Sequence, residues 1–229
     1  MKKVITFTLL ISSLFLIFSC QKENNSRTSP ELTQIFNEQE IKDIEMLVSY
    51  VEKELKAKTK TDDIDKAYQE FLGTYFENYF NDINETFTYE DIKNLYSTID
   101  KNTFNTIWQY NKGFNFVLKD STKSINMAYE KKYMKYLDVL GEKSLKIKGY
   151  VNSTRASGVT PIYSIPPLLF TFNTESRKPE IPKTFGDYNT RVYRSIDLIT
   201  IADLVYHVKI EDVRIQKLKE QEQVKDTVQ

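Results

Sequence analysis

Residues 187–206 read DYNTRVYRSIDLITIADLVY, and this stretch decides the fold of the chain. Asp187 stands where the N-cap of a helix is expected. The apolar residues that follow it keep a helical period; they are Val192, Ile196, Ile199, Ala202 and Val205. Because apolar residues are so dense here, we predict a central, well-buried helix.

The residues after Tyr206 carry conflicting signals. The range 192–215 is rich in β-branched residues, and Val208 and Ile210 alternate as in a strand. No Asn-Gly or Asp-Gly turn divides the stretch, which counts against a hairpin. We therefore predict a helix to about Tyr206 and leave helix and a small C-terminal β element open for residues 205–215. The polar residues 216–229 are expected to fray as a tail.

Most of the chain before Gly158 also shows helical periodicity. The expected helices lie behind the N-cap Asn37 with Glu40, behind Thr61 up to Ile83, behind Thr88, behind Asp100, over 124–140 with Gly141 as its stop, and over 145–157. Together with the 187–206 helix they predict a mainly α fold. We expect an irregular bundle of about six to eight helices, forming a single domain over residues 35–215.

The segment 159–187 interrupts the helical pattern. It contains Gly186 and five prolines, at positions 161, 166, 167, 179 and 182, so it is expected to form turns and at most one or two short helices. Long irregular segments of compact domains often carry function, so this segment is the first place to look for a partner surface. The alternative is a connecting loop packed by Leu168, Leu169, Phe170 and Phe172.

The N-terminus has the pattern of a secretion signal. Lys2 and Lys3 precede the apolar run 4–18, which is too short to span about 30 Å of hydrocarbon comfortably. The residues Ile17-Phe18-Ser19-Cys20 that follow resemble the lipobox of bacterial lipoproteins, which are lipidated on the cysteine and cleaved before it. Phe18 departs from the small or β-branched residue usual at that position. The resemblance implies removal of residues 1–19 and lipidation of Cys20; a conventional signal peptide or an uncleaved anchor is the alternative.

The residues after Cys20 extend this resemblance. Gln21-Lys22-Glu23 is similar to the export tag of Bacteroidota-type lipoproteins that are carried to the cell surface, although Asn24 and Asn25 replace the further acids expected there. The resemblance implies a lipid anchor in the outer membrane, with display at the cell surface and a periplasmic orientation both open. Residues 20–34 are polar and are expected to form the lipidated N-terminus and a flexible tether.

Composition excludes several classes of function. The chain has 32 basic and 32 acidic residues, and without Lys2 and Lys3 the mature chain has 30 and 32, a net charge of −2. The sequence has no concentrated basic region, so no nucleic-acid partner is expected. Cys20 has no second cysteine to pair with, and His207 is the only histidine, which excludes zinc sites built from several such ligands. The six glycines are too dispersed for a phosphate-cradling loop, so no bound nucleotide is expected. No other cofactor is expected.

Aromatic and acidic residues supply the remaining site candidates. The chain has 15 Tyr and 14 Phe, and tyrosine suits protein or glycan recognition, although most of these residues fall at core-facing positions. Trp108 and Tyr110 are the predicted contact pair, because Gly113 soon ends the regular pattern. Asp197 and Asp203 lie inside the apolar helix and are the acids to inspect for catalysis, whereas His207 is expected to be a packing or surface residue.

These observations favour a lipid-anchored extracytoplasmic module that binds a protein or a glycan, rather than an enzyme. Two alternatives remain open. The first is an extracytoplasmic hydrolase that uses paired carboxylates. The second is a structural subunit of a complex in the cell envelope.

Overall fold

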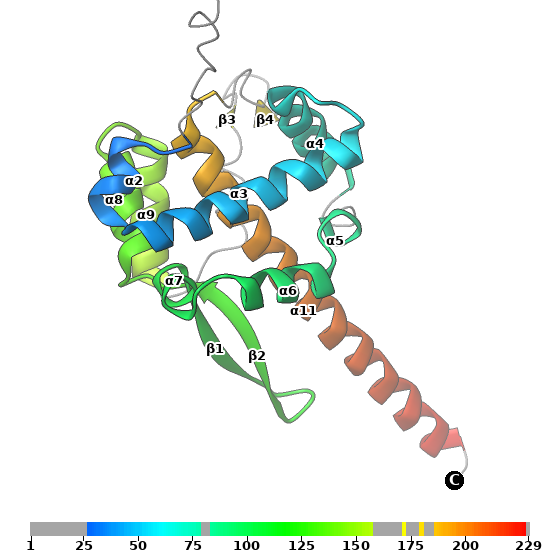
Figure 1. The fold of residues 1–229 in the computed structure, drawn as a ribbon. Helices are drawn as coiled ribbons and strands as arrows, with labels where there is room; N and C mark the ends of the chain where they lie inside the picture. Colours follow the sequence, from blue (N-terminus) through cyan, green and yellow to red (C-terminus); the bar gives the residue numbers. More distant parts are fainter. Residues whose placement is uncertain (1–26, 79–82, 158–170, 173–178, 181–185, 228–229) are drawn as a thin grey trace, which may run out of the picture.

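The computed structural model describes residues 27–78, 83–157, 171–172, 179–180 and 186–227, and this part of the chain is mainly helical, as predicted (Figure 1). Its nine helices are slightly more than the number expected. The helices are α2 (Pro30–Ile35), α3 (Glu38–Thr59), α4 (Ile64–Asn78), α5 (Ile83–Thr86), α6 (Tyr89–Thr98), α7 (Lys101–Ile107), α8 (Lys132–Gly141), α9 (Leu145–Ser157) and α11 (Tyr188–Thr227). The strands are β1 (Trp108–Asn115), β2 (Asp120–Met127), β3 (Thr171–Phe172) and β4 (Pro179–Glu180).

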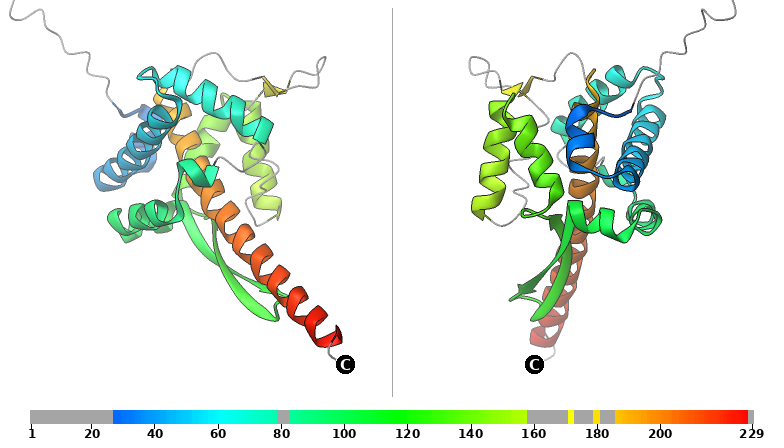
Figure 2. Two further views of the ribbon diagram at one scale, coloured as in Figure 1. Left: turned by 90° about the vertical axis from the view of Figure 1, so that its right-hand side faces the viewer. Right: turned by 60° about the vertical axis from the view of Figure 1, so that its left-hand side comes forward.

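Helix α11 forms the axis around which the other elements pack (Figures 1 and 2). Its first half contacts the helices and the hairpin around it, and Val192, Ile196, Ile199 and Ala202 are fully buried. Asp187 caps it: the Asp187 side chain accepts a hydrogen bond from the backbone N–H of Thr190 at 2.9 Å. The prediction of a central, buried helix is therefore confirmed.

The end of the chain is more helical than expected, and helix is the alternative observed for residues 205–215. Helix α11 continues to Thr227 over 40 residues, about 60 Å, so residues 205–215 are helical and 216–227 are not a frayed tail. The β-branched residues cost only tenths of a kcal/mol each in a helix, and neither Gly nor Pro interrupts the stretch. Burial of the first half thus offsets the weak strand preference of the middle. The second half projects from the body of the molecule (Figure 2).

Two polar residues within the buried half of α11, Ser195 and Thr200, are bound to partners from other elements. The Ser195 hydroxyl lies 3.0 Å from the Tyr68 hydroxyl of α4. The indole Nε1 of Trp108 donates to the Thr200 hydroxyl at 2.8 Å. Buried polar groups are costly without such partners, so these bonds allow Ser and Thr in the core and link α11 to α4 and β1.

Capping signals determine where several helices begin. A capping box opens α3: the backbone N–H of Glu40 donates to the Asn37 side chain at 2.9 Å, and the Asn37 N–H donates to Glu40 at 2.8 Å. Thr88 and Asp100 cap α6 and α7 as predicted. Thr61 was the predicted cap of α4. In the structure, the backbone N–H of Lys66 in the first turn of α4 donates to the side chain of Asp63 instead.

The region between α7 and α8 corrects the predicted helix over 124–140. Strands β1 and β2 form an antiparallel hairpin in which Trp108 pairs with Met127 and Asn115 with Asp120. The Asn115 side chain accepts hydrogen bonds from the N–H groups of both Val117 and Leu118, which closes the loop. Helix α8 therefore begins only at Lys132. The hairpin has no Asn-Gly or Asp-Gly signal, and its pairing is recognisable only when both strands are present.

The last residues of the segment predicted as a tether belong to the folded domain. Residues 30–34 belong to α2, which packs against α8 and fully buries Leu32. The Ser29 hydroxyl also bonds the Asn189 side chain at 2.5 Å, which links this segment to α11. The chain is therefore docked on the domain from about residue 29.

Other predictions fall on residues that the structure does not describe. These are the signal 1–19, Cys20, Gln21, Lys22, Glu23 and most of the segment 159–187. The described parts of that segment include a short antiparallel pair, β3 with β4, rather than a helix. No helix of the described residues combines the length and the apolar composition that crossing a bilayer requires.

Candidate functional site

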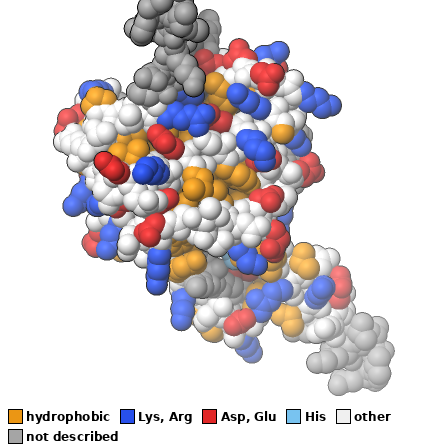
Figure 3. Space-filling view, viewed as in Figure 1, with side chains coloured by type: hydrophobic (Ala, Val, Ile, Leu, Met, Phe, Trp, Pro, Cys, Tyr) orange, Lys and Arg blue, Asp and Glu red, His pale blue; other side chains and the backbone are white. Residues whose placement is uncertain are grey.

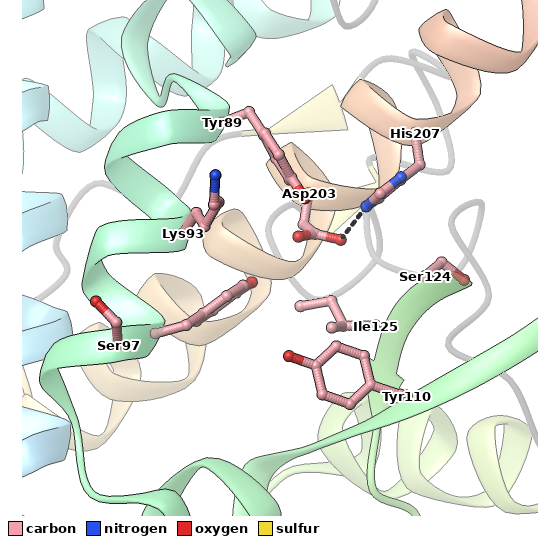
Figure 4. Close-up of a pocket in the computed structure, with 9 residues that line it drawn as sticks. Tyr89, Lys93, Ser97, Tyr110, Ser124, Ile125, Asp203 and His207 are labelled. Atoms are coloured by element: carbon pink, nitrogen blue, oxygen red, sulfur yellow. Dashed lines mark ion pairs between the residues drawn. The ribbon is translucent and has the colours of Figure 1, made fainter. Parts of the chain in front are cut away.

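A cavity of about 500 Å³ lies between α6, the β1–β2 hairpin and α11 (Figure 4). Its volume is within the usual range for small-ligand sites. The residues that line it are Tyr89, Lys93, Tyr96 and Ser97 of α6, Tyr110, Ser124 and Ile125 of the hairpin, and Asp203 and His207 of α11. Three elements that are distant in the sequence therefore form one cavity.

Helical spacing places the lining residues of α6 and α11. Tyr89, Lys93 and Tyr96 follow one another at intervals of four and three residues and therefore share one face of α6. Asp203 and His207 are four residues apart and share one face of α11. The hairpin then closes the third side, where β2 contacts α11.

Asp203 is the most unusual group in the cavity. Asp203 is only 3% exposed, and its Oδ1 accepts no hydrogen bond from the described residues. Burial raises the pKa of this carboxyl to about 7, although the nearby backbone N–H of Ile125 acts in the opposite direction. At pH 7 the carboxyl is therefore about half protonated.

His207 lies next to this carboxyl. Its Nε2 is 3.5 Å from Asp203 Oδ1, which is longer than a good hydrogen bond. Burial lowers the pKa of the imidazole, and Glu211 one turn further opposes this shift only in part. His207 is therefore mostly neutral at pH 7 and supplies little positive charge to Asp203.

Other rings hold the tyrosines of the cavity in place. The Tyr89 ring stacks on that of Tyr206, with centroids 3.8 Å apart and planes 5° apart. The Tyr110 ring stacks on Phe104 with centroids 5.4 Å apart. The Tyr96 hydroxyl is buried and has no hydrogen-bond partner among the described residues, and burial raises the pKa of this phenol well above its usual value. The cavity thus has rigid aromatic walls and two buried polar atoms without partners.

The predicted contact pair does not form a surface patch. Trp108 is 1% exposed and packs against Tyr96 and Phe104, so a contact role for Trp108 was wrong. Its burial follows from its place at the start of β1, where the chain leaves the core. Tyr110, two residues further, is 55% exposed and lines the cavity.

The two candidate catalytic acids, Asp197 and Asp203, do not lie close together. Asp197 and Asp203 are separated by about 9 Å along the helix axis and about 120° around it. Asp197 is fully buried near Tyr133 and Tyr150, and burial raises the pKa of its carboxyl well above the usual range. Only Asp203 lines the cavity, so these carboxylates do not form the pair that glycoside hydrolysis uses.

Neither a catalytic triad nor a metal centre is assembled by the described residues. Ser97 and Ser124 line the cavity, but no hydrogen bond joins either hydroxyl to His207 within the described ranges. The Ser97 hydroxyl instead donates to the backbone oxygen of Asn94 at 2.7 Å. No group of three or more His, Cys, Asp or Glu residues in this part of the chain is arranged to hold a metal ion.

Sequence reasoning missed most of the cavity. Tyr89, Lys93 and Tyr96 have the spacing of one helix face, and this signal was readable, but aromatic residues at such spacing usually belong to a core. Ser124 and Ile125 were assigned to a helix, which hid their position on the hairpin. The missing information was which elements pack against α6.

A second feature is the exposed tip of the hairpin. Phe114, Phe116 and Val117 are exposed there, and Phe116 is 84% accessible. Asn115 bonds Glu211 at 3.1 Å and Asp120 pairs with Arg214 at 2.7 Å, so the hairpin is fastened to the projecting half of α11.

On the face shown in Figure 3, basic and acidic side chains are interspersed rather than gathered in one charged patch.

No protein-family model, curated protein or solved structure matches this chain.

Proposed function

We propose that this protein is a lipid-anchored binding module of the bacterial cell envelope, with the cavity beside Asp203 as its ligand site. One observation carries the proposal: a buried carboxyl with an unpartnered oxygen lines a cavity walled by tyrosines. Buried polar atoms nearly always have partners, so a buried carboxyl oxygen without a hydrogen bond at the wall of a cavity is a candidate contact for a ligand. The buried carboxyl and the tyrosine walls support binding, and within the described residues neither a catalytic triad nor a metal centre accompanies them.

The anchor is the second part of the proposal. The lipobox-like residues Ile17-Phe18-Ser19-Cys20 support lipidation of Cys20 and attachment to the outer membrane, on the cell surface or facing the periplasm. Helix α2, the first described element, and the end of α11 lie at opposite ends of the molecule (Figure 1). With an anchor before α2, the end of α11 would belong to the end of the molecule opposite the anchored one.

A ligand screen tests the cavity. Protein carrying Cys20→Ser would be screened by calorimetry against saccharides, amines, organic acids and short peptides. Tyr110→Ala should weaken any specific ligand at least tenfold, because it removes one wall of the cavity. Phe114→Ala is the matched control: it removes an equally exposed aromatic side chain from the same strand, outside the cavity lining. A ligand that binds all three proteins equally would place the binding site elsewhere.

The hydrolase alternative retains one supporting observation. A carboxyl with a pKa of about 7 is suited to general acid or base catalysis near neutral pH. If the protein is a hydrolase, Asp203→Asn should reduce kcat on a glycan or ester substrate by at least a hundredfold. Turnover that is unaffected by this substitution would remove the only residue that supports the alternative.

The structural-subunit alternative draws on the hairpin tip instead. Exposed apolar residues of this kind often mark contacts between proteins. A complex of defined stoichiometry that dissociates on Phe116→Ser, while the cavity variants leave it intact, would favour this alternative over the binding module.

A further inference from the structure

The charges around the cavity are unbalanced. Asp203 is the one acidic residue among the described residues that line it, and its carboxyl is almost fully buried. A buried carboxylate is costly unless a positive charge lies close to it. Neutral His207, at 3.5 Å, does not provide that charge.

Lys93, the other charged residue of the lining, does not compensate Asp203 either. Its Nζ pairs with Glu90 Oε2 at 3.4 Å, and its side chain is 60% exposed at the rim. In Figure 4 its ammonium group points away from Asp203. The carboxyl therefore faces the cavity without a cation held against it by the described lining residues.

The walls of the cavity suit a positive charge. Tyr89 lies beside Asp203 in Figure 4, and Asp203 also acts electrostatically on Tyr96. The faces of tyrosine rings attract ammonium groups, and recognition of quaternary ammonium ligands uses such rings together. An anion would meet the Asp203 carboxylate, and a neutral sugar would leave its charge uncompensated.

We propose that the cavity binds an organic ammonium group, primary or quaternary, with its charge against Asp203 and its carbon atoms against Tyr89 and Tyr110. The inference rests on the proposed binding function and specifies its ligand class. The shared chemistry is a compact alkylammonium, which a small free amine and a lysine side chain of a peptide both carry.

Binding of this kind should depend on pH in a defined way. Because the carboxyl must be ionised to pair with the cation, the apparent dissociation constant is inversely proportional to the ionised fraction of the carboxyl. With a pKa of about 7, that fraction rises about tenfold between pH 6 and pH 8. Protonation of His207, below its own pKa, would weaken binding of the cation further. The titratable and charged groups around Asp203 are His207, Glu211 beyond it, Lys93 with its partner Glu90, and the phenols of Tyr89, Tyr96 and Tyr110.

Calorimetry with charge-matched probes tests the inference on the detergent-solubilised, full-length mature protein. Choline is compared with 3,3-dimethyl-1-butanol, its uncharged isostere, and a lysine-containing tetrapeptide with its norleucine twin. We expect choline or the lysine peptide to bind at least tenfold more tightly than its neutral twin, and the stronger of the two identifies the source of the ammonium group. Affinity should also increase about tenfold from pH 6 to pH 8.

Variants separate the cavity from the rest of the surface. Asp203→Asn should weaken the cation at least tenfold and abolish most of the pH dependence, and Tyr110→Ala should weaken it at every pH. Phe114→Ala should bind as wild type does. Equal binding of charged and neutral twins, or no binding of either cation at 10 mM, overturns the inference. If a saccharide or an anion then binds and Tyr110→Ala weakens it, the proposed binding function survives; if nothing binds at the cavity, both fail.

Discussion

The carboxyl of Asp203 should destabilise the folded protein at neutral pH. Its pKa is about 7 in the fold and 3.8 in an unperturbed aspartate, because burial disfavours the charged form. A carboxyl with a higher pKa in the folded state binds more protons when folded than when unfolded. The free energy of unfolding therefore decreases as the pH rises from about 4 to about 7 and levels off above that.

The magnitude follows from the difference of about three pKa units, which corresponds to about 4 kcal/mol once the carboxyl is ionised in both states. Water that enters the open cavity screens the charge, so we expect a cost of about 2–4 kcal/mol at pH 8. Asp203→Asn keeps the volume of the side chain and removes its titration. Relative to wild type, the variant should gain about that amount of stability between pH 4 and pH 8.

Urea unfolding followed by circular dichroism, at intervals from pH 4 to pH 8, measures this difference. His207 contributes in the opposite direction. Because burial lowers its pKa in the fold, its contribution to stability is lost as the pH falls below about 6.5, so wild type and variant are compared at the same pH. Asp212→Asn is the control, since it removes an exposed carboxylate from the same helix. Parallel stability profiles for wild type and Asp203→Asn would refute the reasoning, because they would show that the carboxyl titrates normally in the fold.

Three further predictions concern the anchor, the core and a helix cap. Cys20→Ser should abolish palmitate labelling and release the protein from membranes; retention without label would contradict the lipobox interpretation. Trp108→Phe, which loses a buried hydrogen bond, should cost about 1–2 kcal/mol in chemical denaturation, whereas Phe116→Ala at the exposed tip should stay within about 0.5 kcal/mol. Asn37→Ala should cost about 1 kcal/mol of stability in thermal unfolding, because it removes the cap of α3, whereas Asn37→Asp should retain most of the stability that the cap provides. Equal losses of stability in the two variants would contradict the capping role.

Elements with local signals were predictable from the sequence. The caps of α3, α6, α7 and α11 are short-range hydrogen bonds between neighbouring residues, so their positions can be read directly. Gly141 was also a correct stop: a side chain there would approach the backbone of Lys148 to 3.2 Å, where the chain turns from α8 into α9. These features depend on a few consecutive residues and not on what packs against them.

The hairpin shows why other elements were not predictable. The residues of β2 carry apolar side chains at positions compatible with either a helix or a strand, and only pairing with β1 selects the strand. The burial of Trp108 also depends on a distant element, because its indole Nε1 bonds Thr200 of α11, 92 positions further along the chain. A local pattern does not contain that contact.

The sequence by itself determined that this chain is mainly helical and that residues 187–206 form its centre, because helix periodicity and capping are local properties. Only the tertiary structure decided where the candidate site lies. It brings Tyr89 of α6 and Tyr110 of β1 to Asp203 of α11, and it buries that carboxyl enough to raise its pKa. Burial and charge balance depend on every element that surrounds a group, so the chemical character of Asp203 arises from the packing of three distant segments.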